Sequence, residues 1–323
     1  TLTDYFKPDN SSNIIIKNST KKPMSYNAFQ LNLSGGGKYS ITYTDKYPIS
    51  DTNESYATPL INISGVTLDI TGLQFQNVSG QLFDIYDSSV SLTSIKISGG
   101  STDSSNSLIK VVSNKPNLSL FGASFEAPTS VLNKLTLTDI SINSITYGVS
   151  GIIEIHGGNV DISNLLIKDC SGYKDLNDNK ILQSKSQKEF INTLWSPLTL
   201  LNTSASIMNS DFSNNNHSTS SYSAQAITSY SSSMTIQKTR FSMANSVTNL
   251  YKQWIKATLP DISSYWDEAS GQHSIPMIRN YDISNIASKQ ITISGCNWVI
   301  SNDVSNINYL YFFVDKQGYT DAV

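Results

Sequence analysis

The sequence is poor in charged residues, in cysteine and in histidine, and each shortage excludes a class of protein. Charged residues make up 15% of the 323, and 22 basic against 25 acidic side chains give a formal net charge of −3. This balance supplies no electrostatic attraction to nucleic acid. Two cysteines exclude a disulfide framework or a four-thiolate zinc site, and the three histidines lie far apart. We therefore expect no nucleic-acid partner, no metal and no cofactor.

Long apolar runs are also missing. None reaches the roughly 18 residues that a membrane helix needs, so we expect no transmembrane segment in this chain. An initiator Met and a signal-peptide pattern are absent too, which we interpret as a mature chain or a fragment. Ser, Thr and Asn are abundant and supply 111 of the 323 residues. Large apolar residues recur among them throughout, so this polar composition does not predict disorder.

An eight-residue phrase of the form apolar-x-apolar-x-x-apolar-x-apolar recurs along the chain. Its first copy is Leu68, Ile70, Leu73 and Phe75, and most copies follow one another at 22 to 29 residues. The second apolar positions of the eight copies are Ile70, Leu92, Leu120, Leu137, Ile162, Ile207, Ile236 and Ile293. The copies with Ser210 and Thr239 at their third apolar position are degraded. Because alternation turns every second side chain inward, the phrase predicts two short strands, and its extra residue predicts a bend between two sheets.

A third strand precedes several copies of the phrase, at residues 83–85, 109–111, 153–155 and 198–200. Ser, Gly and Asn, which tolerate tight turns, lie between the strands. Three short strands in each repeat of 22 to 28 residues predict an all-β parallel solenoid with coils about 4.8 Å apart. An antiparallel sandwich would also give many short strands, but it would not repeat one phrase at coil-length intervals.

These phrases resemble the right-handed parallel β-helix of the pectin-lyase-like superfamily, especially its repeat-rich surface and secreted proteins. The resemblance covers about residues 60 to 314 and is one of pattern. The superfamily's enzymes degrade polysaccharides, and polygalacturonase-like members carry Asn-Thr-Asp, Asp-Asp, Gly-His-Gly and Arg-Ile-Lys motifs. None of the four occurs in this sequence. The resemblance therefore implies the fold and not the enzymatic activity.

Interruptions of the phrase suggest the domain boundaries. We expect residues 1–58 to form a strand-rich cap or docking segment outside the register of the phrase, residues 59–314 to form the β-helix, and residues 315–323 to form a tail. Insertions are expected at 169–196 and 242–276. Within the second insertion, apolar residues at helical spacing predict a short helix near 245–259.

Outward positions of the predicted strands carry the candidate polar sites. Asp84, Lys110 and Glu154 form a column of alternating charge, which we interpret as a solvated ladder. His156 stands two residues after Glu154 and is interpreted as a locally hydrogen-bonded turn residue, with a catalytic pair as the alternative. Asp267 and Glu268 near His273 are interpreted as a solvated loop. The run of Gly35, Gly36, Gly37 and Lys38 lacks the spacing of a phosphate-binding loop and predicts a turn before the Tyr39–Tyr43 strand.

Nine Asn-x-Ser/Thr sequons are present, about as many as chance gives for this composition, and each is a possible N-glycosylation site. They are Asn10, Asn18, Asn32, Asn53, Asn62, Asn77, Asn117, Asn202 and Asn216. An apolar strand at 308–314 has no evident cap, and it predicts a fragment, a strand capped by a neighbour, or head-to-tail stacking. The possible assembly contacts are Tyr309, Leu310, Tyr311, Phe312 and Phe313, with Trp254 in the helical segment.

The two cysteines test the coil assignment. Cys296 takes the third apolar position of its phrase and is expected to be a buried, inert residue. Cys170 follows the fifth phrase about three coils earlier, roughly 14 Å away along the axis. A disulfide joins Cα atoms about 4.4 to 6.8 Å apart, so we expect no bridge between them.

These observations favour a structural function. We expect an extracellular β-solenoid glycoprotein that self-associates, head to tail or laterally, in a cell-surface fibre, coat or adhesive layer. It is expected not to be an enzyme. The alternative is a polysaccharide-active enzyme or carbohydrate-binding module on the same fold, and a third possibility is an ectodomain fragment of a larger protein.

Overall fold

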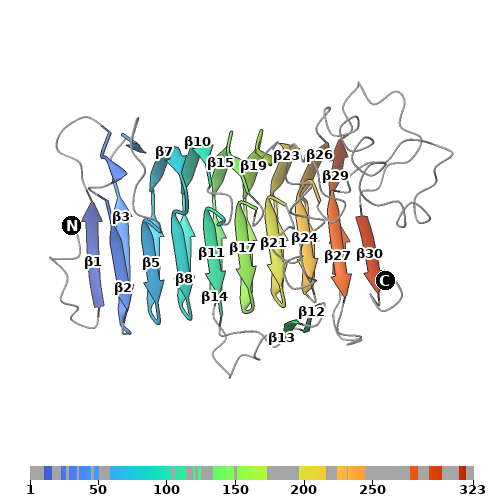
Figure 1. The fold of residues 1–323 in the computed structure, drawn as a ribbon, viewed down its shortest axis with the longest axis horizontal. Coiled ribbons are helices and arrows are strands. Elements are labelled where there is room, and N and C mark those ends of the chain that lie inside the picture. Colours follow the sequence, from blue (N-terminus) through green and yellow to red (C-terminus); the bar gives the residue numbers. More distant parts are fainter. Residues whose placement is uncertain are drawn as a thin grey trace.

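The residues that the structure describes form three sheets of parallel strands with almost no helix (Figure 1). The structure is a computed structural model. It describes residues 11–16, 23–26, 29–34, 36–44, 47–50, 59–102, 106–113, 119–120, 123–124, 134–148, 151–172, 196–215, 224–230, 232–243, 277–282, 291–299 and 313–317. The expected all-β class with parallel pairing is confirmed, and the arrangement is consistent with a parallel β-helix.

We name the three sheets A, B and C. Sheet A contains, in spatial order, β1 (Ser11–Ile16), β3 (Lys38–Tyr43), β6 (Thr67–Thr71), β9 (Ser89–Thr93), β14 (Lys134–Thr138), β18 (Asn159–Ser163), β22 (Ser204–Met208), β25 (Ser233–Gln237) and β28 (Ile291–Ser294). Sheet C contains β2 (Leu31–Ser34), β5 (Ile61–Ser64), β8 (Phe83–Tyr86), β11 (Ile109–Val112), β17 (Ile153–His156), β21 (Leu198–Leu201), β24 (Ile227–Tyr230), β27 (Ile278–Asp282) and β30 (Phe313–Gln317). Sheet B contains β4 (Ile49–Ser50), β7 (Gln74–Ser79), β10 (Lys96–Ser101), β15 (Ser141–Asn143), β16 (Thr146–Tyr147), β19 (Leu166–Lys168), β20 (Ser171–Gly172), β23 (Asp211–Asn215), β26 (Arg240–Met243) and β29 (Asn297–Val299).

Successive strands visit sheets C, A and B in turn, and we call each such round a coil. The strands β8, β9 and β10, for example, form one coil, and each pairs in parallel with its counterpart in the coils on either side. The coils follow one another along the long axis, with β1 and β30 at opposite ends (Figure 1). The strands predicted before the phrases are the sheet C strands β8, β11, β17 and β21.

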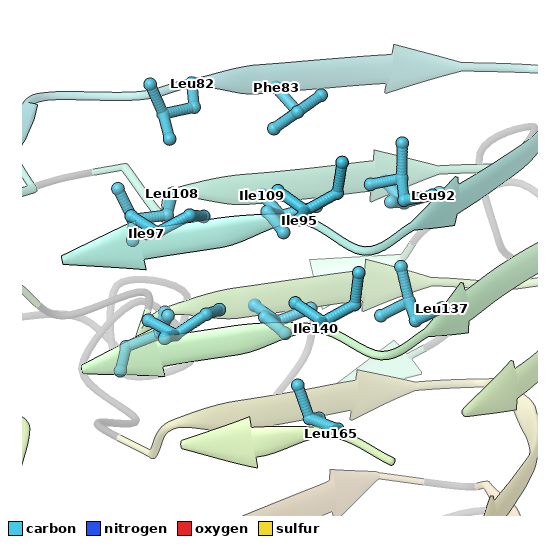
Figure 2. Close-up of a cluster of buried hydrophobic side chains, with 14 of the residues drawn as sticks. Leu82, Phe83, Leu92, Ile95, Ile97, Leu108, Ile109, Leu137, Ile140 and Leu165 are labelled. Atoms are coloured by element: carbon cyan, nitrogen blue, oxygen red, sulfur yellow. The ribbon is translucent and has the colours of Figure 1, made fainter. Parts of the chain in front are cut away.

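The core lies between the three sheets. Alternation along each strand buries one set of side chains, as in β6, where Leu68 and Ile70 are buried and the residues on either side are exposed. The first two apolar positions of a phrase lie in sheet A and the last lies in sheet B, so Leu68 pairs with Val90 and Phe75 with Ile97. Equivalent side chains of successive coils therefore form layers of one continuous core (Figure 2).

The extra residue of the phrase makes the bend between sheets A and B. It adopts a left-handed backbone, with φ between 49° and 84°, in seven successive coils. The residues are Gly72, Ser94, Asp139, Asn164, Asn209, Lys238 and Gly295. Five of the seven are Gly, Asn or Asp, which are the types that tolerate this conformation best. The N–H groups stay paired with the next coil, as from Ser94 to the Thr138 carbonyl at 2.9 Å, so the stack continues through the bend.

The degraded copies are explained by hydrogen bonds inside this bend. The Ser210 hydroxyl accepts the Leu165 N–H of the preceding coil at 3.2 Å and donates to the Met208 carbonyl at 3.0 Å. Thr239 repeats both contacts one coil later, with the Ser210 N–H and the Gln237 carbonyl. Both side chains are buried. A hydroxyl therefore replaces the apolar side chain without leaving a buried polar group unpaired.

One predicted phrase is wrong. Residues 118–125 do not form a coil, because sheet A passes directly from β9 to β14. Two short strands, β12 (Ser119–Leu120) and β13 (Ala123–Ser124), instead pair antiparallel outside the three sheets. Short alternating apolar runs are common to both arrangements, so the pattern alone did not distinguish a coil from a hairpin.

The expected register break before residue 59 is also wrong. Tyr39 and Ile41 in β3 pair with Leu68 and Ile70, and β2 and β4 continue sheets C and B. Gly36 and Gly37 have positive φ and Lys38 begins β3, as expected for a turn before that strand. The N-terminal strands therefore form part of the same stack.

At the other end, a strand does join sheet C near the chain's last residues, but it is β30, later than predicted. Phe313 begins it, whereas Tyr309 to Phe312 lie outside the described residues. The predicted helix at 245–259 with Trp254, the group of Asp267, Glu268 and His273, and most of the expected insertions also lie outside them. Cys170 and Cys296 are both free, and the coils that contain β22 and β25 lie between them.

Candidate functional site

The outer face of sheet C carries the charged column that the sequence predicted. Lys110 in β11 lies in register between Asp84 in β8 and Glu154 in β17, so neighbouring side chains alternate in sign. A second outward column beside it runs from Tyr86 through Val112 to His156. Parallel in-register pairing brings these residues from three strands, up to 72 positions apart in the sequence, onto one patch.

Exposure falls steadily along this face. Asn32 and Asn62 are exposed, Asp84, Lys110 and Glu154 are half-buried, and the next members of the column, Thr199 and Thr228, are buried. By contrast, the outward column of sheet A from Asp69 to Thr292 contains exposed and half-buried side chains and no buried one. Burial of outward side chains means that the second half of the sheet C face is covered. The charged residues therefore stand at the border between an open and a covered surface.

Glu154 and His156 form the closest polar pair on this border. Their two-residue separation in β17 puts both on the outer face, and Glu154 Oε1 lies 2.5 Å from His156 Nε2. Their side chains are 13% and 18% exposed, so water screens the pair only partly. The local hydrogen bond predicted for His156 is confirmed. A carboxylate that accepts the Nε2 proton leaves Nδ1 as the basic nitrogen, which gives the pair the chemistry of a proton acceptor.

Asp84 is the second carboxyl group of the site. Burial raises its pKa, the nearby Lys110 and a hydrogen bond from Gln81 lower it, and the charge of Glu154 raises it, with a net upward shift. The Gln81 amide is itself held in place because Nε2 donates to the Phe83 carbonyl at 3.1 Å. Asp84 therefore lies in an environment that disfavours its charge despite the neighbouring ammonium group.

Hydroxyl groups continue the column beyond Glu154. Thr228 shares a short hydrogen bond with the Ser196 hydroxyl, and Ser196 Oγ also accepts the Ala224 N–H. The Thr199 hydroxyl is buried and has no hydrogen-bond partner in the described part of the chain. Two carboxyl groups, one amine, one imidazole and two buried hydroxyls thus line one face. Sequence reasoning identified the charged column but missed Thr199 and Thr228, because their burial depends on what covers the sheet.

The C-terminal end of the core is a second notable feature. Ile291, Ile293, Cys296 and Trp298 occupy inward positions of β28, β29 and their bend, yet all four are only partly buried. Equivalent residues one coil earlier, such as Ile236 and Phe241, are fully buried. Trp298 ends an aromatic stack with Phe241, at 4.7 Å between ring centroids. The expected full burial of Cys296 is therefore wrong, because its layer is the last of sheets A and B in the described chain.

Four of the nine sequons fall on described residues. Asn32, Asn62 and Asn77 are exposed, whereas Asn202 is half-buried in a turn. Asn10, Asn18, Asn53, Asn117 and Asn216 lie outside the described residues.

In the described ranges, no group of three or more His, Cys, Asp or Glu side chains is arranged to hold a metal ion. The same ranges contain no helix with the length and apolar character needed to cross a bilayer. Comparisons with models of protein families, with curated proteins and with solved structures gave no match for this chain.

Proposed function

We propose that this chain is a right-handed parallel β-helix of the pectin-lyase-like kind. We further propose that it serves as a structural extracellular glycoprotein, self-associating to form or decorate a surface fibre, coat or adhesive layer. Its strands are hydrogen-bonded coil to coil along the long axis, which favours a stiff rod. The outer face of sheet A is built mainly from Ser and Thr with few charges, a neutral surface suited to lateral packing.

The half-exposed core layer at the C-terminal end carries this proposal. Every preceding layer of the core is covered by another of the same construction, so the surface of Ile291, Ile293, Cys296 and Trp298 is complementary to a coil of this kind. Residues 291–299 include no charged side chain, and covering them therefore costs no desolvation of charge. A second copy of the chain is the occupant we propose for this end.

The N-terminal end differs from it. Ile16 in β1 and Leu31 in β2, which belong to the first strands of sheets A and C, are buried. A head-to-tail stack would join an open layer to a closed one. The contact we favour instead joins two C-terminal ends around a two-fold axis, with sheet A faces left for lateral contacts.

The oligomeric state tests this function. Sedimentation velocity over a range of concentrations is expected to show a dimer or larger species. Ile293→Lys places a charge in the open layer and is expected to give monomers, whereas Thr292→Lys, which is exposed on the opposite side of the same strand, is expected to leave assembly unchanged. A wild-type monomer at all concentrations, or equal effects of the two variants with both folded by circular dichroism, would contradict the proposal.

A second candidate function is polysaccharide binding or cleavage on the outer face of sheet C. The observation that favours it is the half-buried Glu154–His156 pair near the second carboxyl group of Asp84. Release of reducing or unsaturated sugar ends, or calorimetric binding of acidic and neutral oligosaccharides, would support it if Glu154→Gln abolished the signal. If the wild-type chain gives neither sugar release nor oligosaccharide binding, this candidate function is contradicted.

A further inference from the structure

Two of the sequons lie side by side on the outer face of sheet C. Asn32 in β2 pairs in register with Asn62 in β5, and the third residues of the two sequons, Ser34 and Ser64, pair in the same way. All four side chains are exposed. Adjacent parallel strands are about 4.8 Å apart, so the two acceptor amides form one outward pair at the N-terminal end of the stack.

The other two described sequons have different surroundings. Asn202 is half-buried at a left-handed turn, and the next residue, Thr203, is buried and donates its hydroxyl to the Leu201 carbonyl at 2.9 Å. Asn77 is exposed, but it too has a left-handed backbone, and its amide oxygen lies against Gly99 of the next coil. The half-buried Asn202 side chain therefore offers less room for a sugar than the exposed side chains of Asn32 and Asn62.

We propose that Asn32 and Asn62 are N-linked glycan attachment sites and that Asn202 is not. In the transfer, the Asn Nδ2 forms a bond to C1 of the first sugar of a lipid-linked diphosphate oligosaccharide. The bond from C1 to the diphosphate oxygen breaks, the lipid diphosphate leaves, and Nδ2 gives up one proton. This inference rests on the proposed function, since it requires passage through a eukaryotic secretory pathway.

The position of the pair fits the other features of the molecule. The next residue in the same column is Asp84, where the face becomes half-buried, so Asn32 and Asn62 occupy the exposed part of that face. They also lie at the opposite end of the stack from the half-exposed layer of Ile291, Ile293, Cys296 and Trp298. The sugar-bearing end and the proposed assembly end are therefore separate.

The test is site mapping on the full chain secreted from a eukaryotic cell line. Removal of N-glycans by peptide N-glycosidase in ¹⁸O-labelled water, followed by mass spectrometry, marks each occupied Asn without any substitution. We expect the label at Asn32 and Asn62 and none at Asn202. Asn32→Gln and Asn62→Gln should each remove one glycan from the secreted protein, and the matched variant Asn202→Gln should leave the number of glycans unchanged.

An unmodified Asn32 or Asn62, or a modified Asn202, would overturn the inference. The outcome is separable from the proposed function, because recombinant secretion tests the sites alone. The proposed extracellular role fails independently if the chain in its native source is located inside the cell.

Discussion

Close contact between successive coils predicts that two glycine substitutions differ sharply in effect. Gly100 in β10 has φ of 102° and pairs with Val78, and a Cβ built on it would lie 2.0 Å from the Val78 carbonyl oxygen. Gly65 also has positive φ, of 68°, but a Cβ there would meet nothing within 4 Å. Both lie at exposed turns or strand ends, so Gly→Ala at the two positions separates backbone strain from contact between coils.

The expected losses in the free energy of unfolding follow from backbone strain and from contact between coils. A left-handed backbone costs an alanine about 1–2 kcal/mol, and the stiffer unfolded chain returns about 0.4–1 kcal/mol, so Gly65→Ala is expected to cost about 1 kcal/mol. Gly100→Ala must also push two coils apart, because real Cβ contacts do not fall below 3.0 Å. The neighbouring coil-to-coil bonds, from Gly80 N–H to the Ser101 carbonyl and from Thr102 N–H to the Thr146 carbonyl, are at risk. At about 1 kcal/mol each, they raise the expected cost to about 3 kcal/mol or more.

Urea unfolding followed by circular dichroism and by tryptophan fluorescence measures both variants. The two probes also show whether unfolding is cooperative, which a stack of coils does not guarantee. Equal losses for Gly65→Ala and Gly100→Ala would refute the reasoning, since they would mean that no neighbouring backbone lies against Gly100.

Three further predictions concern single side chains. Ser210→Val removes a buried hydroxyl and leaves its two partners, the Leu165 N–H and the Met208 carbonyl, without that hydrogen bond. It is expected to lower the free energy of unfolding in urea by about 1–3 kcal/mol, whereas Ser206→Val on the outer face should change it by less than about 0.5 kcal/mol. Similar costs would contradict the hydrogen-bonded bend. Burial raises the pKa of the Cys170 thiol to about 12, so maleimide at pH 8 should label the half-buried Cys296 first. Early labelling of Cys170 would count against its buried position. Burial also raises the pKa of Asp84 above 3.8, so this carboxyl group binds a proton more readily in the folded protein than in the unfolded chain. The contribution of Asp84 to stability should therefore rise as the pH falls through the raised pKa. Melting temperatures measured between pH 7 and pH 3 should show a smaller rise for Asp84→Asn than for the wild type, with no loss of stability at pH 7. An unchanged pH profile in the variant would contradict the raised pKa.

The phrase predicted most of the fold because it records two independent physical constraints. Alternation fixes which side chains enter the core, and the extra residue fixes the bend, where a left-handed backbone recurs from Gly72 to Gly295. The same pattern failed at residues 118–125, where short alternating runs form a hairpin instead of a coil. It also failed before residue 59, because Tyr39 and Ile41 satisfy the register without a complete phrase around them.

The candidate site was only partly predictable. Outward positions placed Asp84, Lys110 and Glu154 in one column, since parallel register needs nothing beyond the coil assignment. Burial of Thr199 and Thr228 could not be predicted, because it depends on what covers the face and not on the strand's own alternation. The hydroxyls of Ser210 and Thr239 looked like defects in an apolar pattern, since their hydrogen bonds join residues 29 to 45 positions apart.

The assignment of one coil to each confirmed phrase underlies the whole account, and distances between spin labels test it most directly. Asp69, Thr235 and Thr292 are exposed members of one register column on sheet A. In a Cys296→Ser background, labels at 69 and 235 span five strand spacings and should lie about 24 Å apart, while labels at 69 and 292 span six and should lie about 29 Å apart. If double electron–electron resonance gives a distance one strand spacing longer for the 69–292 pair than for the 69–235 pair, the stacked arrangement is supported. A separation near 34 Å for the longer pair would restore residues 118–125 as a coil, and distances that do not increase from Thr235 to Thr292 would contradict the stacked architecture.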